Sequence, residues 1–197
     1  MDHFNVFPDN IITGEGVFAS QFLKSGITTF HEACRYVYEL TYGYNSNRDD
    51  SLILFSEKKG SCTTKHAVIA SLAEELGMPV HKYIGIYAMT EDIVTGTDEI
   101  LTKYGLSYLP MIHCFLVYEN RRVDLTEGNK NGKNKPLDDF LFIEKVIPDI
   151  SAKDEYLLYR KAVQNIILSR EDMKGADMKT ILHAREEGIK LLRSKIL

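Results

Sequence analysis

Apolar residues recur three and four positions apart in four stretches of the chain, and this spacing predicts four amphipathic helices. The first begins after Thr29, which can cap the helix while Glu32 bonds back to the cap amide. The second covers residues 62–76 and ends at Gly77, where a left-handed cap belongs, shortly before Pro79. The other two lie near the C-terminus, over residues 156–168 and from Asp177 onward.

Three runs rich in β-branched and aromatic residues predict strands over residues 80–88, 111–118 and 122–126. A tight turn at Glu119-Asn120 separates the last two, which makes them an antiparallel hairpin. Residues 89–109 have no clean period and are interpreted as an excursion or a lid. Helices followed by a hairpin and by further helices are typical of the α+β class, with a small antiparallel sheet.

The length of 197 residues fits a core domain over residues 1–150 and a C-terminal helical extension over residues 151–197 packed on that core. Hydrophobic residues make up 44% and charged residues 26%, so the chain is expected to fold. A net charge of −4 argues against a dedicated nucleic-acid binder, and no apolar run reaches the length of a membrane span. Three cysteines and the absence of a signal-peptide pattern favour a cytoplasmic protein.

Cys62 is the sharpest chemical signal, because it stands in the first turn of the helix predicted over residues 62–76. The positive end of the helix dipole and the unpaired amides of that turn favour a thiolate over a thiol. Gly60 permits a close approach of the backbone, Ser61 is a candidate N-cap, and nearby lysines add positive charge. This environment suits a cysteine nucleophile.

A cysteine nucleophile needs a base and a group that orients the base, and the predicted hairpin offers both. With a two-residue turn, Tyr118 pairs with Arg121, and Asp124 becomes the diagonal neighbour of His113 on the same face. One imidazole nitrogen of His113 can then take the proton of Cys62, while Asp124 fixes the other nitrogen as a donor.

The chain resembles the core of the transglutaminase-like superfamily over residues 58–128, in the runs GSCTTKHAVIASLAEELGMPVHKYIG and MIHCFLVYENRRVDLTEG. In that family the nucleophilic Cys starts a helix, a His begins a strand and an Asp ends the next strand. Cys62, His113 and Asp124 hold those positions here. The resemblance implies a papain-like core and a Cys-His-Asp triad that transfers an acyl group, or hydrolyses a peptide or protein amide, through a thioester. It implies neither cofactor nor metal.

Two positions depart from the family pattern. Phe115 and Arg122 stand where family members often carry an aromatic residue such as Trp, and the chain has no Trp. The backbone amide of Cys62 is expected to be one donor of an oxyanion hole, and the second donor stays unassigned. An enzyme of the same general arrangement that transfers acetyl groups to arylamines is a further alternative. It lacks support because the usual Arg-Gly-Gly run before the Cys is absent.

A zinc site is the alternative interpretation of the same histidines and cysteines. The pairs Cys62 with His66, and His31 with Cys34, have the spacing of helical zinc ligands, although such pairs also arise by chance. His66 is otherwise interpreted as a solvated neighbour of Cys62.

The competing function is a non-catalytic binding module for a peptide or protein partner. The apolar stripe of the C-terminal helix is then a candidate surface for that partner, or for a second copy of the chain. Two further expectations concern Cys114 and the loop over residues 127–135. Cys114 is expected to point away from the site and into the core, and the lysine-bearing loop over residues 127–135 is interpreted as solvated.

Overall fold

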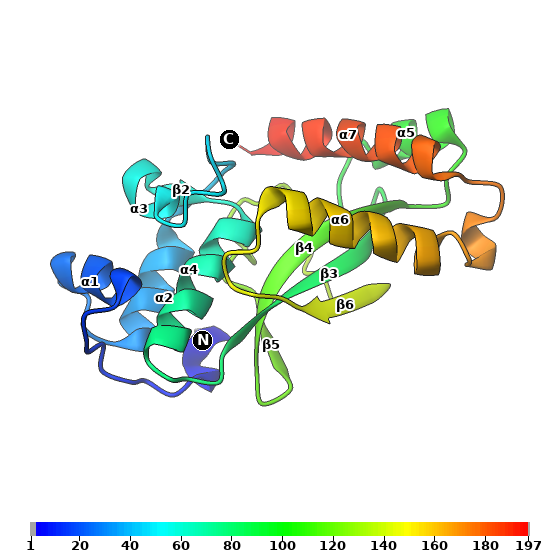
Figure 1. Ribbon diagram of the computed structural model, residues 1–197. Coiled ribbons are helices and arrows are strands. Elements are labelled where there is room, and N and C mark those ends of the chain that lie inside the picture. The colour runs from blue at the N-terminus through cyan, green and yellow to red at the C-terminus, as the bar shows by residue number, and fades with distance from the viewer. Residues whose placement is uncertain (1–2, 197) are drawn as a thin grey trace.

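The computed structural model describes residues 3–196 and centres on a four-stranded antiparallel sheet in the order β5-β4-β3-β6 (Figure 1). The strands are β3 (His81–Met89), β4 (Leu109–Tyr118), β5 (Arg121–Val123) and β6 (Phe142–Lys145). The sheet and the helices around it confirm the α+β class.

The predicted hairpin is present between β4 and β5. Tyr118 pairs with Arg121, as the two-residue turn requires. Glu119 and Asn120 both take positive φ angles, 45° and 65°, which match the twist of the flanking strands. The second strand of the hairpin is shorter than the predicted 122–126, because pairing stops at Val123. Beyond that point β4 has an open edge.

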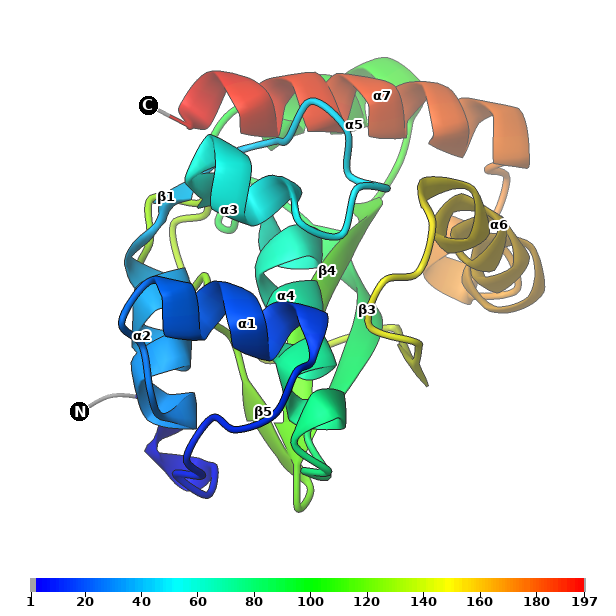
Figure 2. The same cartoon turned by 60° about the vertical axis from the view of Figure 1, so that its left-hand side comes forward.

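The helices of the N-terminal half gather at one end of the sheet around α4 (Figures 1 and 2). Their buried side chains form a first hydrophobic cluster, to which Leu116 and Val123 of the hairpin also belong. The Thr29 capping box and the α4 boundaries confirm the sequence prediction. The elements of this half are η1 (His3–Val6), α1 (Val17–Lys24), α2 (Phe30–Glu39), β1 (Thr41–Tyr42), α3 (Ile53–Glu57), β2 (Lys59–Gly60) and α4 (Cys62–Glu75).

The remaining helices cover the other end of the sheet and form a second hydrophobic cluster with β3 and β4 (Figure 1). Helix α7 packs on both α5 and β4. Gly188 makes this possible, since a Cβ there would lie 2.4 Å from Cδ2 of Leu109. The elements are α5 (Thr97–Tyr104), α6 (Ala152–Ala162), a π-helical turn over Val163–Ile167, a 3₁₀ turn over Glu171–Met173 and α7 (Met178–Lys195).

The apolar stripe of α7 is turned in part into the chain's own core, where Ile181 and Leu192 are buried, while Leu182 and Ile189 are only partly buried. Its use as a surface for a partner or a second copy stays a prediction. Residues 90–108 do not line the main cavity and therefore form no lid over it. They form α5, which packs on α7 instead.

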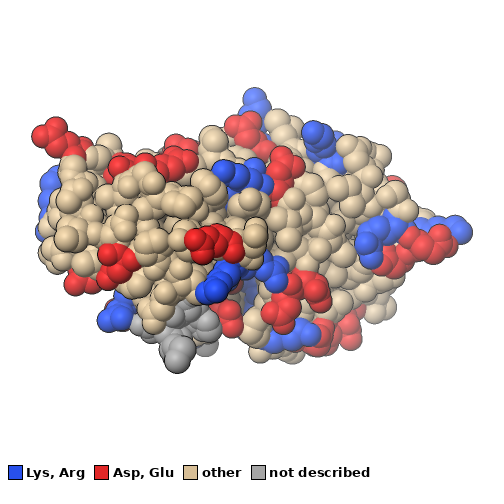
Figure 3. Space-filling view, turned by 90° about the horizontal axis from the view of Figure 1, so that it is seen from below, with Lys and Arg blue, Asp and Glu red and all other residues tan. Residues whose placement is uncertain are grey.

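The surface charge of the described residues is mixed. Acidic and basic side chains are interspersed over the face seen in Figure 3, without a continuous basic area. None of the helices in residues 3–196 has the length and apolar character needed to cross a membrane.

Candidate active site

Cys62 lies in a third, smaller group of buried side chains with Tyr42, Ile84 and Cys114. Helix α4 begins at Cys62, and the side chain of this residue is held in the interior with 7% of its surface exposed. Ser61 occupies the N-cap position as predicted, but its hydroxyl makes no capping bond. The amides of the first turn therefore stay available to a negative charge.

His113 projects from β4 and is bound to Asp124, which follows directly after β5. Nε2 of His113 lies 2.7 Å from Oδ2 of Asp124. The other oxygen of Asp124 accepts two bonds of 2.7 Å from the backbone N–H and the hydroxyl of Thr126. These contacts hold the carboxylate in place and fix Nε2 as the protonated nitrogen of a neutral His113. Nδ1 of His113 is buried and has no hydrogen-bond partner within residues 3–196.

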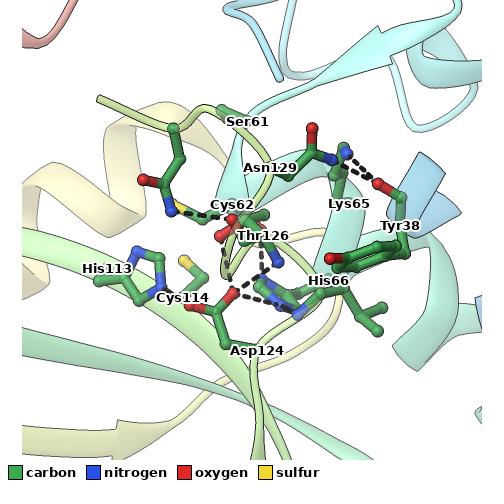
Figure 4. A network of polar contacts seen from close by, with 12 residues as sticks. Tyr38, Ser61, Cys62, Lys65, His66, His113, Cys114, Asp124, Thr126 and Asn129 are labelled. Carbon is green, nitrogen blue, oxygen red and sulfur yellow. Dashed lines mark hydrogen bonds and ion pairs between the residues drawn. The ribbon is translucent and has the colours of Figure 1, made fainter. Parts of the chain in front are cut away.

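His66 connects the cysteine helix to the segment that follows β5, at Asp124 and Leu125 (Figure 4). Its Nδ1 donates to the carbonyl oxygen of Cys62 at 2.7 Å, and its Nε2 accepts the backbone N–H of Leu125 at 2.8 Å. The interpretation of His66 as a solvated residue is wrong, because the side chain is completely buried. Since both nitrogens are engaged, His66 acts as a positioning residue for Cys62 and Asp124.

Cys114 lies beside Cys62, which corrects the expectation that it points away from the site. Side chains alternate between the two faces of a strand, and this rule underlay the expectation. The rule itself holds, since β4 pairs with β3 without a bulge at His113 and Cys114; the expectation did not foresee that β5 ends opposite Leu116 and leaves this edge of β4 open. Helix α4 packs against β4 and can bring Cys62 near the side chains of both faces.

The surroundings of Cys62 favour its thiolate. The pKa of Cys62 is held well below its usual range by the Cys114 thiol, which can donate a hydrogen bond to the thiolate, and then by the charge of His113. Burial raises the pKa of Cys62, and the positive charge of Lys133 lowers it by a smaller amount. Burial also lowers the pKa of His113, but the charge of Asp124 outweighs it, so the pKa of His113 rises to about 9. A thiolate–imidazolium pair is therefore expected at neutral pH.

Lys133 corrects the interpretation of the 127–135 loop as wholly solvated. The loop turns inward, and Lys133 lines the same cavity as Cys62, with its ammonium 5.9 Å from the centre of the Tyr42 ring. Burial lowers the pKa of Lys133, while the negative charges of the Cys62 thiolate and the Asp124 carboxylate act to raise it. A flexible polar sequence gives no signal of this kind, because the contact depends on the path of the whole loop.

The cavity beside Cys62 has a volume of about 430 Å³, within the range of small-molecule sites. Its walls come from the segment after β1, from α6 and from α7. The hydroxyl of Tyr42 faces the backbone N–H of Cys62, and burial raises the pKa of this phenol well above its ordinary value. Tyr42 therefore stays a hydrogen-bond donor close to the first turn of α4.

The zinc alternative does not fit the side chains. His66 has no free nitrogen, and His31 bonds to the carbonyl of Phe7 at 2.8 Å while its other nitrogen lies 3.6 Å from Asp9. No group of three or more His, Cys, Asp or Glu side chains within the described chain is arranged to hold a metal ion. All three cysteines are free thiols.

Comparisons of the chain with protein-family models, with curated proteins and with solved structures give no match.

Replacing Cys114 with Ala is expected to raise the pKa of Cys62, because the thiolate loses the hydrogen-bond donor that lowers this pKa most. The pH dependence of alkylation of Cys62 by iodoacetamide, followed by peptide mass spectrometry, measures this shift. Cys34→Ala is the matched control, since Cys34 is buried in the first hydrophobic cluster. An unchanged titration in Cys114→Ala would show that the two thiols do not interact.

Proposed function

We propose that the protein is a cysteine-dependent enzyme that transfers an acyl group, or hydrolyses an amide or peptide bond, through a thioester on Cys62. One observation carries the proposal: a buried cysteine at the start of α4 adjoins a histidine whose far nitrogen is fixed by Asp124 at 2.7 Å. Nucleophile, base and orienting acid are the three parts that such chemistry needs.

In the first half of the reaction the Cys62 thiolate attacks the carbonyl carbon of the substrate, and a carbon–sulfur bond forms. The carbon–nitrogen bond then breaks, and His113 gives the proton on Nδ1 to the departing amine. Asp124 keeps Nε2 protonated and stabilises the imidazolium before this transfer. The products are a free amine and an acyl group held on Cys62 as a thioester.

In the second half water or an amine attacks the thioester. Nδ1 of His113 takes the proton of the attacking group, the carbon–sulfur bond breaks, and Cys62 leaves as the thiolate. The acid or the new amide is released, and both residues return to their starting states. The unpartnered Nδ1 is the nitrogen that remains for these transfers.

The negative charge on the substrate oxygen needs donors, which we assign to two groups. The backbone N–H of Cys62 is the first, because it lies in the uncapped first turn of α4. The Tyr42 hydroxyl is the second, since it faces that amide and stays protonated. Tyr42 thus takes the place that the sequence left unassigned.

The arrangement also supports our proposal of a transglutaminase-like core. A helix that begins at the cysteine packs against the strand that carries the histidine, and the aspartate follows the next strand. Three free thiols suit a reducing compartment, so we propose a cytoplasmic location.

An activated neutral ester tests the enzyme proposal without knowledge of the natural substrate. With 4-nitrophenyl acetate, we expect a burst of about one nitrophenolate per chain and an acetyl group on the peptide that contains Cys62. Cys62→Ala should reduce the burst by at least about a hundredfold, since the covalent step needs the nucleophile. Cys34→Ala should retain the burst.

Two results would contradict the proposal. One is an equal burst in the wild type and in Cys62→Ala. The other is a Cys62 thiol that shows no acylation and titrates near the ordinary value of about 8.5. The second result would favour the non-catalytic binding module.

A further inference from the structure

The cavity beside Cys62 carries more positive than negative charge, although the whole chain has a net charge of −4. Two carboxylates line it and both are engaged: Glu155 binds Arg48 through two hydrogen bonds, and Asp49 accepts the backbone N–H of Ala152. The cations that line the cavity are Arg48, Lys133, Arg185 and Arg193. Three of these four cations have no carboxylate partner within residues 3–196.

Helix α7 supplies two of the unpaired cations from one face. Arg185, Ile189 and Arg193 are four residues apart and all line the cavity, as expected for positions stacked along one side of a helix. Each guanidinium lies over an aromatic ring, with its centre 4.6 Å from the ring centroid, Arg185 on Tyr159 and Arg193 on Tyr44. Stacking restricts the arginines and leaves their N–H edges free to bind an oxygen anion.

Three buried polar atoms of the cavity residues lack a partner in the described part of the chain. One is Nε of Arg48, whose other two guanidinium nitrogens bind Glu155. The other two are Nε of Arg185 and the hydroxyl of Tyr87, whose residue is 1% exposed. A buried polar group without a hydrogen bond costs free energy, and natural sites with such groups commonly bind them to a ligand or to water. Arg185 and Tyr87 both line the cavity that contains Cys62, which makes a ligand bound there a candidate partner for these two atoms.

We propose that the substrate of this site is a small amide that carries a carboxylate, bound by Arg185 and Arg193 with the Tyr87 hydroxyl. The inference rests on the function proposed above and adds the class of substrate. Guanidinium groups match a carboxylate with two parallel hydrogen bonds, and the restricted volume suits a small molecule or a chain end. Lys133 lies by Cys62 and adds to the positive field that attracts the anion.

Reagents that differ only in charge test the proposal on the intact protein. N-chloroacetylglycine and N-chloroacetylglycinamide place the same reactive carbon at Cys62, but only the first carries a carboxylate. We expect the carboxylate reagent to alkylate Cys62 at least about tenfold faster than the amide at low salt, after correction for a free thiol. This preference should fall to about one in Arg185→Gln and Arg193→Gln.

Lys190→Gln is the matched control, because it removes one positive charge from the exposed side of α7, outside the cavity. Fast alkylation by both reagents without a preference would overturn the substrate inference and leave the enzyme proposal standing. A preference that persists equally in both arginine variants would also overturn it.

A binding measurement keeps the inference testable if the thiol proves unreactive, in which case the enzyme proposal fails separately. Calorimetric titration of Cys62→Ala compares N-acetylglycine, N-acetylglycinamide and inorganic phosphate. Binding of N-acetylglycine that is at least about tenfold tighter than binding of the amide, and weaker in Arg185→Gln, supports the inference. Tighter binding of phosphate than of N-acetylglycine, or no difference between acid and amide, contradicts the assignment of a carboxylate.

Discussion

Replacing His113 with Ala is expected to slow alkylation of Cys62 at pH 6 by roughly tenfold to a hundredfold. The thiolate then loses the positive charge that, after the Cys114 thiol, lowers its pKa most. As the thiolate pKa rises, a smaller fraction of Cys62 is ionised at pH 6, and the greater nucleophilicity of a more basic thiolate offsets only part of this loss. Rates measured with iodoacetamide from pH 5 to 9 give the size of the shift.

Cys114 must stay in place during this measurement, because its thiol lies beside Cys62 and itself lowers the pKa. The alkylated peptides are therefore separated and assigned by mass spectrometry. His183→Ala is the matched control, since His183 is exposed on α7 and should leave the titration unchanged. Identical pH profiles in the wild type and in His113→Ala would refute the coupling of this histidine to the thiol.

His113→Ala also leaves Asp124 as a buried carboxylate without its main partner, which threatens the fold. His113→Asn provides a second variant, because its amide can donate to Asp124 but cannot carry the positive charge. If both variants melt cooperatively and both raise the pKa of Cys62, the effect comes from the lost charge. At alkaline pH the wild type should lose its acid function near pH 9, where His113 releases its proton.

The sequence predicts the parts of the site whose signals are local. Cys62 follows from helix periodicity and from Gly77 at the end of α4, where φ is +65°. The hairpin register follows from a turn of two residues, and it brings Asp124 within hydrogen-bond distance of His113. The catalytic role of these residues stays a prediction, while their placement is a feature of the structure.

The parts that the sequence does not predict depend on where strands end and how distant segments pack. Alternation along β4 places Cys114 away from His113, and the sequence alone does not show that β5 ends early or that Cys62 lies beside Cys114. His66 lies on an amphipathic helix, and its two hydrogen bonds depend on the approach of Leu125, 59 positions later. The strand β6 is missed because its four residues, FIEK, follow a long polar loop and pair only at an edge.

The roles of the α7 arginines also depend on the packing of distant segments, which the sequence does not predict. Arg185 and Arg193 lie next to an apolar stripe, and the pattern alone assigns them to the solvated side of a helix. They line the cavity because Gly188 lets α7 approach β4 closely and because Tyr44 and Tyr159 supply rings beneath them. The reactive residues are thus easier to predict than the residues that would select a substrate.

Replacing Glu155 with Gln is expected to lower the free energy of unfolding by about 2–3 kcal/mol. The side chain of Glu155 retains 8% exposure, and it binds Arg48 through hydrogen bonds of 2.6 Å and 3.1 Å. Without its carboxylate, Arg48 keeps a largely buried charge that lacks a counter-ion. The expected loss stays below that of a fully buried pair, because Arg48 retains 28% exposure. Urea unfolding followed by circular dichroism measures the change.

The Arg48–Glu155 pair also affects the cavity beside Cys62, because it connects two segments of the cavity wall. Arg48 belongs to the segment after β1, and its guanidinium also donates to the carbonyl of Ile150 at 3.3 Å, just before α6. The pair therefore ties together two walls of the cavity that contains Cys62. In Glu155→Gln, amide hydrogen exchange should accelerate over residues 43–50 and 150–156 more than in the strands of the sheet.

The exposed pair of Lys103 and Glu187 is the matched control, with side-chain exposures of 58% and 32%. Glu187→Gln should change the free energy of unfolding by no more than about 0.5 kcal/mol, because water screens this pair. Equal losses in the two variants would show that burial does not decide the value of the Arg48–Glu155 contact. The combined variant Arg48→Met with Glu155→Leu should recover most of the stability, since no buried charge remains unpaired. Its exchange rates over the same two segments then show whether the charges or the packing hold the cavity wall.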